Sequence, residues 1–366
     1  MSTPTCHLKI LIAAPLYPPD PGGPALHAAC YVARFSQKGI ATQVAVFSRL
    51  LWLPFGVRHA VFLAQLLWKA RGVSVIYALD TNSVGWAAFM VAFLLRKKLL
   101  LRIGGDLLWE RLAEFGKVAH PMSTFYASGA HQSFFLYYTV RFSLHRADRI
   151  IVPTALLKDV YVQWYGIAAE RLTVIPNPVP ERVDIGYVKE QRTIVYASRM
   201  VRYKNLDCVL DAIAEMRHTL GPPRFVLMGD GPELPRLRDR VAQEGLQSWV
   251  TLPGRVTEER VLQETQGALL TLGPASTEFS PNAVLRGLAY GKPFLISREH
   301  GLPFTVPEML LFDPASKEEF IRKLTYLLTP DGYLAAKSWL ATLDYHQSWE
   351  DAIKKNLEII RGICSR

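Results

Sequence analysis

The sequence predicts an α/β protein of two Rossmann-like, doubly wound domains that face a cleft. The chain has 366 residues, which is enough for two domains of ordinary size. Short apolar runs alternate with helical patterns in two successive series, as expected for parallel strands joined by helices. Between the two series, residues 174–180 read VIPNPVP, and a segment so rich in proline continues neither a helix nor a strand.

The first series predicts five strands and the helices between them. A helix is expected over residues 24–38. Residues 81–95 carry no charge and are followed by Arg96, but the run is too short to span a bilayer, so we expect a helix buried in the core. The strands of this half are predicted at residues 8–14, 43–47, 73–78, 98–103 and 149–153.

The second series restarts at residue 193, after a polar stretch that ends at Gln191. A last helical pattern, at residues 348–363, follows the final strand. We therefore place the first domain at residues 1–182, the second at 183–345 and a C-terminal helix in 346–366. The strands of this half are predicted at residues 193–198, 225–228, 250–252, 268–272 and 293–297.

Composition and charge exclude several classes of protein. Half of the residues are hydrophobic and 20% are charged, which excludes a disordered or fibrous chain. The four cysteines lie far apart without a C-x-x-C pair, which excludes a zinc ribbon and a small disulfide scaffold and favours a reducing cytoplasm. Residues 1–182 hold 19 Lys and Arg against 9 Asp and Glu, whereas residues 183–366 hold 23 of each. The basic half indicates an anionic partner or surface, or only solvated charge.

Aromatic and basic residues are mixed in the first half. The run LLWLPFGV at residues 50–57 precedes Arg58, and Trp68 precedes Lys69 and Arg71. Such a mixture suits attachment to the surface of an anionic membrane. Aromatic residues buried in a core explain it equally well. The other members of this set are Phe134, Phe135, Tyr137 and Tyr138.

In each of the two series, one candidate phosphate-binding loop follows the first strand. Gly22 and Gly23 precede the helix at residue 24, whose free N–H groups favour an anion, although an ordinary glycine turn fits equally well. Arg199 and Lys204 follow the strand at 193–198. Two cations that face a helix N-terminus would form a diphosphate clamp, whereas either alone would be an ordinary surface charge.

Two further loops complete the candidate site in the second half. The MGDGP segment at residues 228–232 makes a tight turn, which is also an ordinary connection between a strand and a helix. After Glu278, a helix opening at Ser280 or Pro281 would leave N–H groups free for phosphate oxygens, and Gly291 would end that helix.

Several catalytic signatures are missing from the sequence. There is no D-x-D motif, which a metal-dependent site for a nucleotide diphosphate on a single Rossmann-like domain usually needs. There is also no H-E-x-x-H motif and no G-x-S-x-G motif. We therefore expect neither a zinc hydrolase nor a serine hydrolase, and no bound metal.

The ordered set of these motifs resembles the retaining glycosyltransferases of family 4, also called group 1, which have the two-domain GT-B fold. The resemblance runs over nearly the whole chain and is strongest in residues 190–305. Trp349 looks like the tryptophan that begins a helix crossing back to the first domain. The other matching segments, in order, are Gly22–Gly23, ADRII at 147–151, IPNPV at 175–179, Ser198–Arg199, Lys204–Asn205, GDGP at 229–232, LPG at 252–254, Glu278 and GKP at 291–293.

The resemblance implies roles for the matching residues. Arg199 and Lys204 would hold the donor diphosphate and stabilise the leaving nucleotide in place of a metal ion. Glu278 would bind hydroxyl groups of the donor sugar. The first domain would take the acceptor and the second the nucleotide sugar. The remaining donor contacts would come from Gly22, Gly23, Gly229, Asp230, Gly254, Val256, Asn282, Ala283 and Arg286.

Two positions depart from the family pattern. Arg286 stands where the family usually has a second Glu that binds the ribose, and an arginine side chain only donates hydrogen bonds. It would instead pair with Glu278 or touch a phosphate. Glycine stands where many members carry a His after the fourth strand, and Asp106 is the nearest ionisable group. Asp106 would act on an acceptor hydroxyl, or it would only cap the next helix.

The sequence thus predicts a metal-independent hexosyl-type glycosyltransferase that needs no cofactor beyond its nucleotide-sugar co-substrate. It would retain the anomeric configuration and act on a lipid-linked or polysaccharide acceptor in cell-surface polysaccharide or glycolipid synthesis. We expect a cytoplasmic protein, with the inner face of the membrane as an alternative place, and no nucleic-acid partner. The alternative function is a degenerate GT-B protein that binds nucleotide or glycan without turnover.

Overall fold

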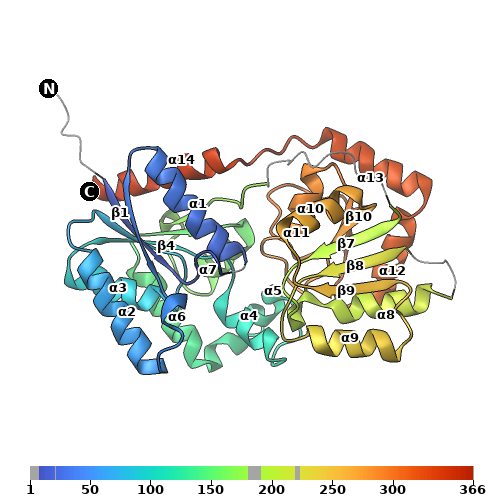
Figure 1. Ribbon diagram of the computed structural model, residues 1–366, viewed down its shortest axis with the longest axis horizontal. Coiled ribbons are helices and arrows are strands. Elements are labelled where there is room, and N and C mark those ends of the chain that lie inside the picture. The colour runs from blue at the N-terminus through green and yellow to red at the C-terminus, as the bar shows by residue number, and fades with distance from the viewer. Residues whose placement is uncertain (1–7, 21, 180–190, 219–222, 366) are drawn as a thin grey trace. The chain divides into compact units, whose positions relative to one another are not determined.

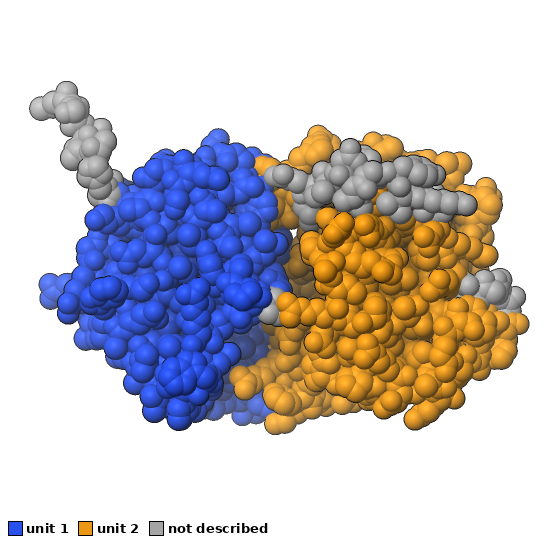
Figure 2. All heavy atoms as spheres, in the orientation of Figure 1, with its two compact units in different colours: residues 1–108, 128–177, 349–366 blue, residues 109–127, 178–348 orange. Residues whose placement is uncertain are grey.

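The computed structural model describes residues 8–20, 22–179, 191–218 and 223–365. They form two compact units, which Figure 2 shows in separate colours. Unit 1 contains residues 1–108, 128–177 and 349–366, and unit 2 contains residues 109–127 and 178–348. Residues 109–127 therefore belong to unit 2, although they come from within the first predicted domain. Much of the polar stretch expected before Gln191 lies outside the described residues.

A parallel sheet with the strand order β2-β1-β3-β4-β5-β6 forms the centre of unit 1 (Figure 1). Every residue of β3 is buried, which explains why its sequence is apolar throughout: helices cover both faces of the sheet. The strands are β1 Lys9–Ala14, β2 Ala41–Val46, β3 Val75–Ala78, β4 Lys98–Arg102, β5 Arg149–Val152 and β6 Leu172–Val174.

The strand order also decides which face each helix covers. Connections between parallel strands are right-handed, so α1, in the step from β1 outward to β2, covers one face of the sheet. The later steps run in the opposite direction and place α2, α3, α6 and α7 on the other face. The helices are α1 Gly23–Gln37, α2 Phe55–Lys69, α3 Gly85–Leu94, α6 Phe135–Arg146 and α7 Ala155–Gln163, with short 3-10 turns at Ser48–Leu50, Ala130–Ser133 and Ala169–Arg171.

The C-terminal helix α14, Trp349–Cys364, packs with α1 on the first face of this sheet. The Trp349 ring lies 5.0 Å from the His27 ring and 6.0 Å from the Tyr31 ring, measured between ring centroids. Deeper in the core, the buried Tyr77 hydroxyl donates a hydrogen bond of 2.6 Å to Asn356 Oδ1. These contacts attach α14, the last helix of the chain, to the rest of unit 1.

Unit 2 is built around a second parallel sheet, with the order β12-β11-β10-β7-β8-β9. The order reverses between β7 and β10: β8 and β9 follow β7 on one side, and β10 begins the other side. The strands are β7 Thr193–Ala197, β8 Arg224–Met228, β9 Val250–Gly254, β10 Leu270–Gly273, β11 Phe294–Ser297 and β12 Leu311–Phe312.

Side-chain caps fix the start of several helices in unit 2. Thr257, Ser316 and Thr329 each accept a hydrogen bond from a backbone N–H in the first helical turn. The helices of this unit are α5 Met122–Ala127, α8 Leu206–Met216, α9 Leu234–Gln243, α10 Glu258–Gly267, α11 Asn282–Ala289, α12 Lys317–Leu327 and α13 Pro330–Thr342, with 3-10 turns η4 Arg202–Lys204 and η5 Glu308–Leu310. Helix α4, Leu107–Glu114, begins in unit 1 and ends in unit 2.

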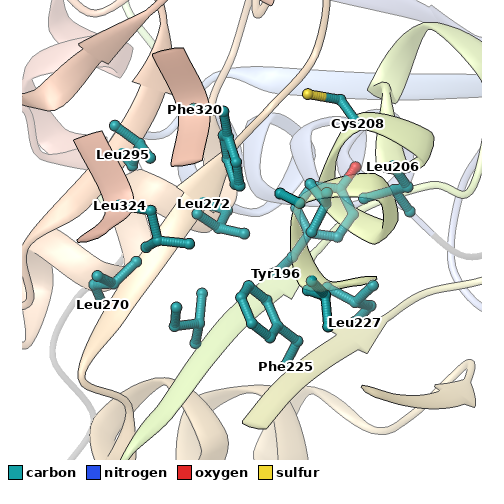
Figure 3. Packing of buried hydrophobic residues seen from close by; sticks show 14 of the residues in the cluster. Tyr196, Leu206, Cys208, Phe225, Leu227, Leu270, Leu272, Leu295, Phe320 and Leu324 are labelled. Carbon is teal, nitrogen blue, oxygen red and sulfur yellow. The ribbon is translucent and has the colours of Figure 1, made fainter. Parts of the chain in front are cut away.

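Figure 3 shows the larger core of unit 2, where helix side chains close over the apolar strands. Phe320 and Leu324 of α12 lie beside Leu272 and Leu295 of β10 and β11. All four side chains are fully buried, so this core fixes the strands whose ends carry the candidate site.

The structure confirms the predicted α/β fold of two Rossmann-like domains and extends it by two short edge strands, β6 and β12. The expectation of a buried helix at residues 81–95 is wrong in part. Helix α3 forms there, but Met90, Phe93 and Leu94 are exposed. No helix within the described residues is long and apolar enough to cross a membrane.

Candidate functional site

The candidate donor residues of unit 2 lie at the carboxyl ends of four neighbouring strands. Parallel sheets bind ligands at this edge, at the point where the strand order reverses. In unit 2 that point lies between β7 and β10. Lys204 follows the first of these strands and Glu278 follows the second, so the topology brings them together.

Lys204 and Glu278 form a buried ion pair, with Nζ of Lys204 2.5 Å from Oε1 of Glu278. Only 11% of the lysine side chain and 5% of the glutamate side chain are exposed. The ammonium group also lies 5.3 Å from the centre of the Tyr203 ring. Two opposite charges held out of water at a ligand-binding edge can receive a ligand that has both anionic and hydroxyl groups.

The backbone on both sides of Glu278 is fixed by the loop that follows β11. The Glu278 N–H donates to the Glu299 carbonyl at 2.9 Å, and the Gly301 N–H donates to the Glu278 carbonyl at 2.8 Å. His300 lies in register with Glu278 in an isolated parallel bridge. Burial lowers the pKa of His300 to about 4, so at neutral pH its Nδ1 accepts the Leu302 N–H at 3.2 Å.

Arg199 lies at the rim of the same edge, and 65% of its side chain is exposed. Its Nη2 is 3.0 Å from Oε1 of Glu114, which lies at the end of α4. Because an exposed ion pair contributes little stability, this guanidinium can exchange its partner for another anion at small cost.

The segment 109–127 holds further residues of this region that sequence reasoning did not identify. Trp109 is fully buried, and its ring meets the rings of Tyr203 and Phe279 edge-on at 5.3 and 5.7 Å. The Tyr203 hydroxyl donates to Glu110 Oε1 at 3.3 Å, and burial, followed by the Glu110 carboxylate, raises the pKa of Tyr203 well above its usual range. No local sequence pattern predicts these contacts, because Tyr203 and Glu110 are 93 residues apart in the chain.

The glycine turn after β8 lies against the loop that carries Arg199. Gly229 has a φ of 141°, and an added Cβ would lie 1.8 Å from the Ser198 carbonyl oxygen. Its N–H donates to the Gly254 carbonyl at 3.0 Å. The Asp230 carbonyl accepts the Met200 N–H at 2.9 Å. Only glycine therefore lets the two loops approach this closely, and their backbone bonds fix the position of Arg199.

Gly254 and Val256 follow β9 at the same edge. Gly254 is buried with a φ of 81°, and the Val256 side chain packs against a small core cluster that includes Val195 and Met228. The Val256 side chain is therefore partly buried.

Helix α11 begins at Asn282, after the N-cap residue Pro281, and therefore slightly later than predicted. The Asn282 N–H already donates to the Ser280 carbonyl at 2.7 Å. Among the described residues, the Ala283 N–H has no hydrogen-bond partner outside the helix, and the buried Ser280 hydroxyl has no partner. Ala283, rather than Asn282, offers a free backbone donor, and Gly291, with a φ of 62°, ends the helix as predicted.

Arg286 pairs with Glu258 and not with Glu278, so the pairing expected from the sequence is wrong. Its Nε donates to Glu258 Oε1 at 3.0 Å and its Nη2 donates to Oε2 at 3.2 Å. The guanidinium side chain is 18% exposed and the carboxylate side chain 63%. The neighbouring helix α10 thus places a carboxylate in front of Arg286.

In unit 1, Gly22 is the N-cap of α1, with a φ of 101°, and Gly23 is the first helical residue. No side chain caps this helix N-terminus within the described residues.

Asp106 immediately precedes α4 and is fully buried, and the Tyr165 hydroxyl donates to it at 3.4 Å. The Asp106 carboxylate is therefore closed off from solvent.

A buried arginine lies near the carboxyl edge of the sheet in unit 1. Arg102 ends β4 and donates to the Tyr31 hydroxyl at 2.7 Å and to Asn177 Oδ1 at 2.8 Å. Burial, followed by the Arg102 charge, lowers the pKa of His27 well below its usual value. Asn177 thus ties the IPNPV segment to the sheet of unit 1.

Two family models match the chain. The model described as Glycosyltransferase Family 4 matches residues 19–182, and the model described as Glycosyl transferases group 1 matches residues 191–330. The two matches follow each other in order and together span most of the chain.

The curated relatives have low sequence identity to this chain, and each matches only part of it. The chain is 24% identical over 221 residues to a phosphatidylinositol N-acetylglucosaminyltransferase subunit of Arabidopsis thaliana, covering 59% of this chain and 49% of that protein. It is 26% identical over 183 residues to alpha-monoglucosyldiacylglycerol synthase of Streptococcus pneumoniae, covering 46% of this chain and 40% of that protein. The chain therefore spans about half the length, or less, of these curated relatives.

Solved structures match over nearly the full chain at low identity. HepE of Anabaena, solved with UDP and glucose, has a TM-score of 0.72 at 16% identity and covers 97% of this chain and 100% of its own. Sucrose-phosphate synthase of Thermosynechococcus elongatus has a TM-score of 0.73 at 16% identity and covers 98% and 99%. This likeness shows the GT-B fold. With the two family matches, it shows that the chain belongs to the group 1, family 4 glycosyltransferases.

Proposed function

We propose that this protein transfers a sugar from a nucleoside diphosphate sugar to an acceptor hydroxyl. The observation that carries the proposal is the buried Lys204–Glu278 pair at the point where the strand order of unit 2 reverses. A buried pair of this kind costs desolvation energy, so its place at a ligand-binding edge favours a role in binding.

In this proposal Lys204 and Arg199 bind the diphosphate. Arg199 exchanges Glu114 for a phosphate oxygen, and Lys204 approaches from the buried side. Their charges stabilise the nucleotide as it leaves, which is the task that a metal ion performs in other transferases. We therefore propose a metal-independent reaction without a further cofactor.

Glu278 accepts hydrogen bonds from the hydroxyl groups of the donor sugar, and the first turn of α11 receives a phosphate. The free Ala283 N–H and the positive end of the helix favour an anion at that position. The Ser280 hydroxyl, which is unpaired within the described residues, is a further donor beside Glu278. The base would lie along the backbone of Gly254 and Val256.

We propose that Arg286 is a working part of this site. The two hydrogen bonds of Arg286 fix the carboxylate of Glu258, which follows Val256 by two residues in the chain. This carboxylate would lie between the proposed positions of the base and the phosphate. A carboxylate there can accept ribose hydroxyl groups, so Glu258 would supply what the family glutamate supplies elsewhere. The alternative, a protein that binds nucleotide or glycan without turnover, is favoured by the same substitution if Arg286 only disables the site.

The proposed acceptor is lipid-linked or a polysaccharide. The names of the relatives from Arabidopsis and Streptococcus specify phosphatidylinositol and diacylglycerol lipids, and HepE was solved with UDP and glucose. We propose a role in glycolipid or cell-surface polysaccharide synthesis, in the cytoplasm at the inner face of the membrane, with retention of the anomeric configuration. Asp106 would position α4 rather than contact the acceptor.

The test is a turnover assay with the full chain, a panel of nucleoside diphosphate sugars and a chelator. The proposal predicts nucleotide release from one donor that continues in the chelator and is lost in Lys204→Met. Nuclear magnetic resonance of the product reports the anomeric configuration. Binding of a donor without release would favour the non-catalytic alternative, and release that stops in the chelator would contradict metal independence.

A further inference from the structure

Three helices of unit 1 form a continuous outer face. Helices α2, α3 and α6 cover the same side of the sheet, and α3 contacts both of the others (Figure 1). The Phe142 ring of α6 stacks on Trp86 of α3 at 5.2 Å and meets Phe89 edge-on at 5.5 Å. These contacts make the outer surfaces of the three helices one surface.

Helix α2 is apolar on both of its sides. Phe62 and Leu66 are fully buried against the sheet, as expected for a covering helix. The opposite side exposes Val57, Val61 and Trp68, at 48%, 40% and 70%. A soluble helix normally carries polar residues on this outer side, so α2 is suited to an apolar partner along its whole length.

The two neighbouring helices and the turn before α2 extend this apolar surface. We define the aromatic face as the exposed large apolar side chains of this region. Two of them, Trp52 and Phe135, are 79% and 82% exposed. The full set is Leu51, Trp52, Phe55, Val57, Val61, Trp68, Met90, Phe93, Leu94, Phe135, Tyr138 and Phe142.

Basic side chains lie at the ends of the three helices of the aromatic face, and none of these helices carries an acidic residue. The sequence has no Asp or Glu in residues 21–79, 81–105 and 115–147, which include all three helices. A helix between parallel strands runs against them, so α2, α3 and α6 all end at the edge where β3, β4 and β5 begin. The basic residues at these ends are Lys69, Arg71, Arg96, Lys97, Lys98, Arg141 and Arg146.

Asp148, the acidic residue closest in sequence to these basic helix ends, is already paired with Lys98. Asp148, which precedes β5, accepts from Lys98 Nζ at 3.3 Å and from the Leu99 N–H at 2.8 Å. The Arg146 guanidinium instead lies 4.9 Å from the centre of the Phe142 ring. The edge therefore keeps a positive charge that adjoins apolar surface.

We propose that the aromatic face and its basic edge lie on an anionic lipid bilayer. Exposed tryptophan and phenylalanine side chains enter the boundary between headgroups and acyl chains, and the basic edge binds anionic headgroups. Because the outer side of α2 exposes apolar side chains from Val57 to Trp68, this helix would lie parallel to the membrane plane rather than enter end-on. An acidic protein partner would match the charge but would not require so many exposed aromatic rings. The proposal rests on unit 1 alone and is independent of the donor site.

The test is co-sedimentation of the full chain with vesicles. Wild-type protein is expected to bind vesicles of phosphatidylglycerol and phosphatidylcholine, to bind phosphatidylcholine vesicles much less, and to be released by salt. We compare two triple variants with the wild type. The aromatic variant combines Trp52→Ser, Trp68→Ser and Phe135→Ser, and the basic variant combines Arg71→Gln, Arg96→Gln and Arg146→Gln. The affinity of each variant for anionic vesicles should be at least about tenfold lower than that of the wild type. All six side chains are exposed, so the fold should tolerate both variants.

A matched control lies elsewhere in unit 1. Lys354→Gln with Lys355→Gln removes exposed charges from α14, which packs with α1 on the first face of the sheet, and should not change vesicle binding. Absence of wild-type binding to the anionic vesicles, or equal binding by all variants, would overturn the proposal. So would a wild-type dimer that the aromatic variant converts to a monomer while vesicle binding stays unchanged, since a second copy would then cover the face.

Discussion

Lys204 and Glu278 are 74 residues apart in the chain, yet Nζ of one lies 2.5 Å from Oε1 of the other, with both side chains almost fully buried. The pair exists because β7 and β10 are neighbours in the sheet although β8 and β9 lie between them in sequence. The two loops that leave these strands therefore meet at one place.

The Lys204–Glu278 pair predicts a separation of stability from function. Lys204→Met leaves a buried carboxylate without its partner and should lower the free energy of unfolding by about 3–5 kcal/mol. The double variant Lys204→Met/Glu278→Leu removes both charges and should recover most of that loss while donor binding stays absent. Thermal unfolding and nucleotide titration measure the two effects, and a double variant that binds donors normally would contradict the assigned roles.

Glu114 is expected to compete with the donor for Arg199. Glu114→Gln removes that competing charge, so affinity for a nucleoside diphosphate should rise by about two- to fivefold, the range of an exposed ion pair. Isothermal titration gives the dissociation constants. Glu215→Gln is a control, because Glu215 pairs with Lys317 on other helices of unit 2. Weaker binding in Glu114→Gln would instead show that Glu114 positions Arg199.

The Arg286–Glu258 pair predicts a rescue by charge exchange. Arg286→Glu places two carboxylates side by side and should weaken donor binding about tenfold or more. The exchanged variant Glu258→Arg/Arg286→Glu should restore much of it, as measured by the same titration. Tighter binding of common donors by Arg286→Glu alone would show that Arg286 disables the site.

His300 predicts a pH dependence of stability. Its pKa is lowered by burial from 6.5 to about 4 in the folded state, so between these values the unfolded chain binds more protons. Stability should therefore fall as the pH drops from about 6.5 to 4, by about 3 kcal/mol at most. Thermal unfolding at several pH values should show a shallower fall in His300→Gln. An identical fall in both proteins would assign the effect to other groups.

Local pattern predicted most strands and the positions of the site loops, because a buried parallel strand needs a continuous apolar run. It did not predict β6 and β12, since a strand of two or three residues has no periodicity. It could not pair Arg286 with Glu258 or Arg199 with Glu114, because these partners meet only through the tertiary fold. Helix α3 was expected in the core because its residues are apolar, yet Phe93 is 67% exposed. Composition alone does not distinguish a core from a surface that has an apolar partner.

The most direct test of the central claim is a thermal-shift screen with UDP, GDP, ADP, CMP and dTDP and their common sugars. Wild-type protein and the Lys204→Met/Glu278→Leu variant are screened together. A ligand at about 100 times its dissociation constant adds roughly 2.7 kcal/mol to stability. The account predicts that one nucleotide and its sugars stabilise the wild type and leave the double variant unchanged. No shift with any of them at millimolar concentration, or an equal shift in both proteins, would contradict a donor site built on Lys204 and Glu278.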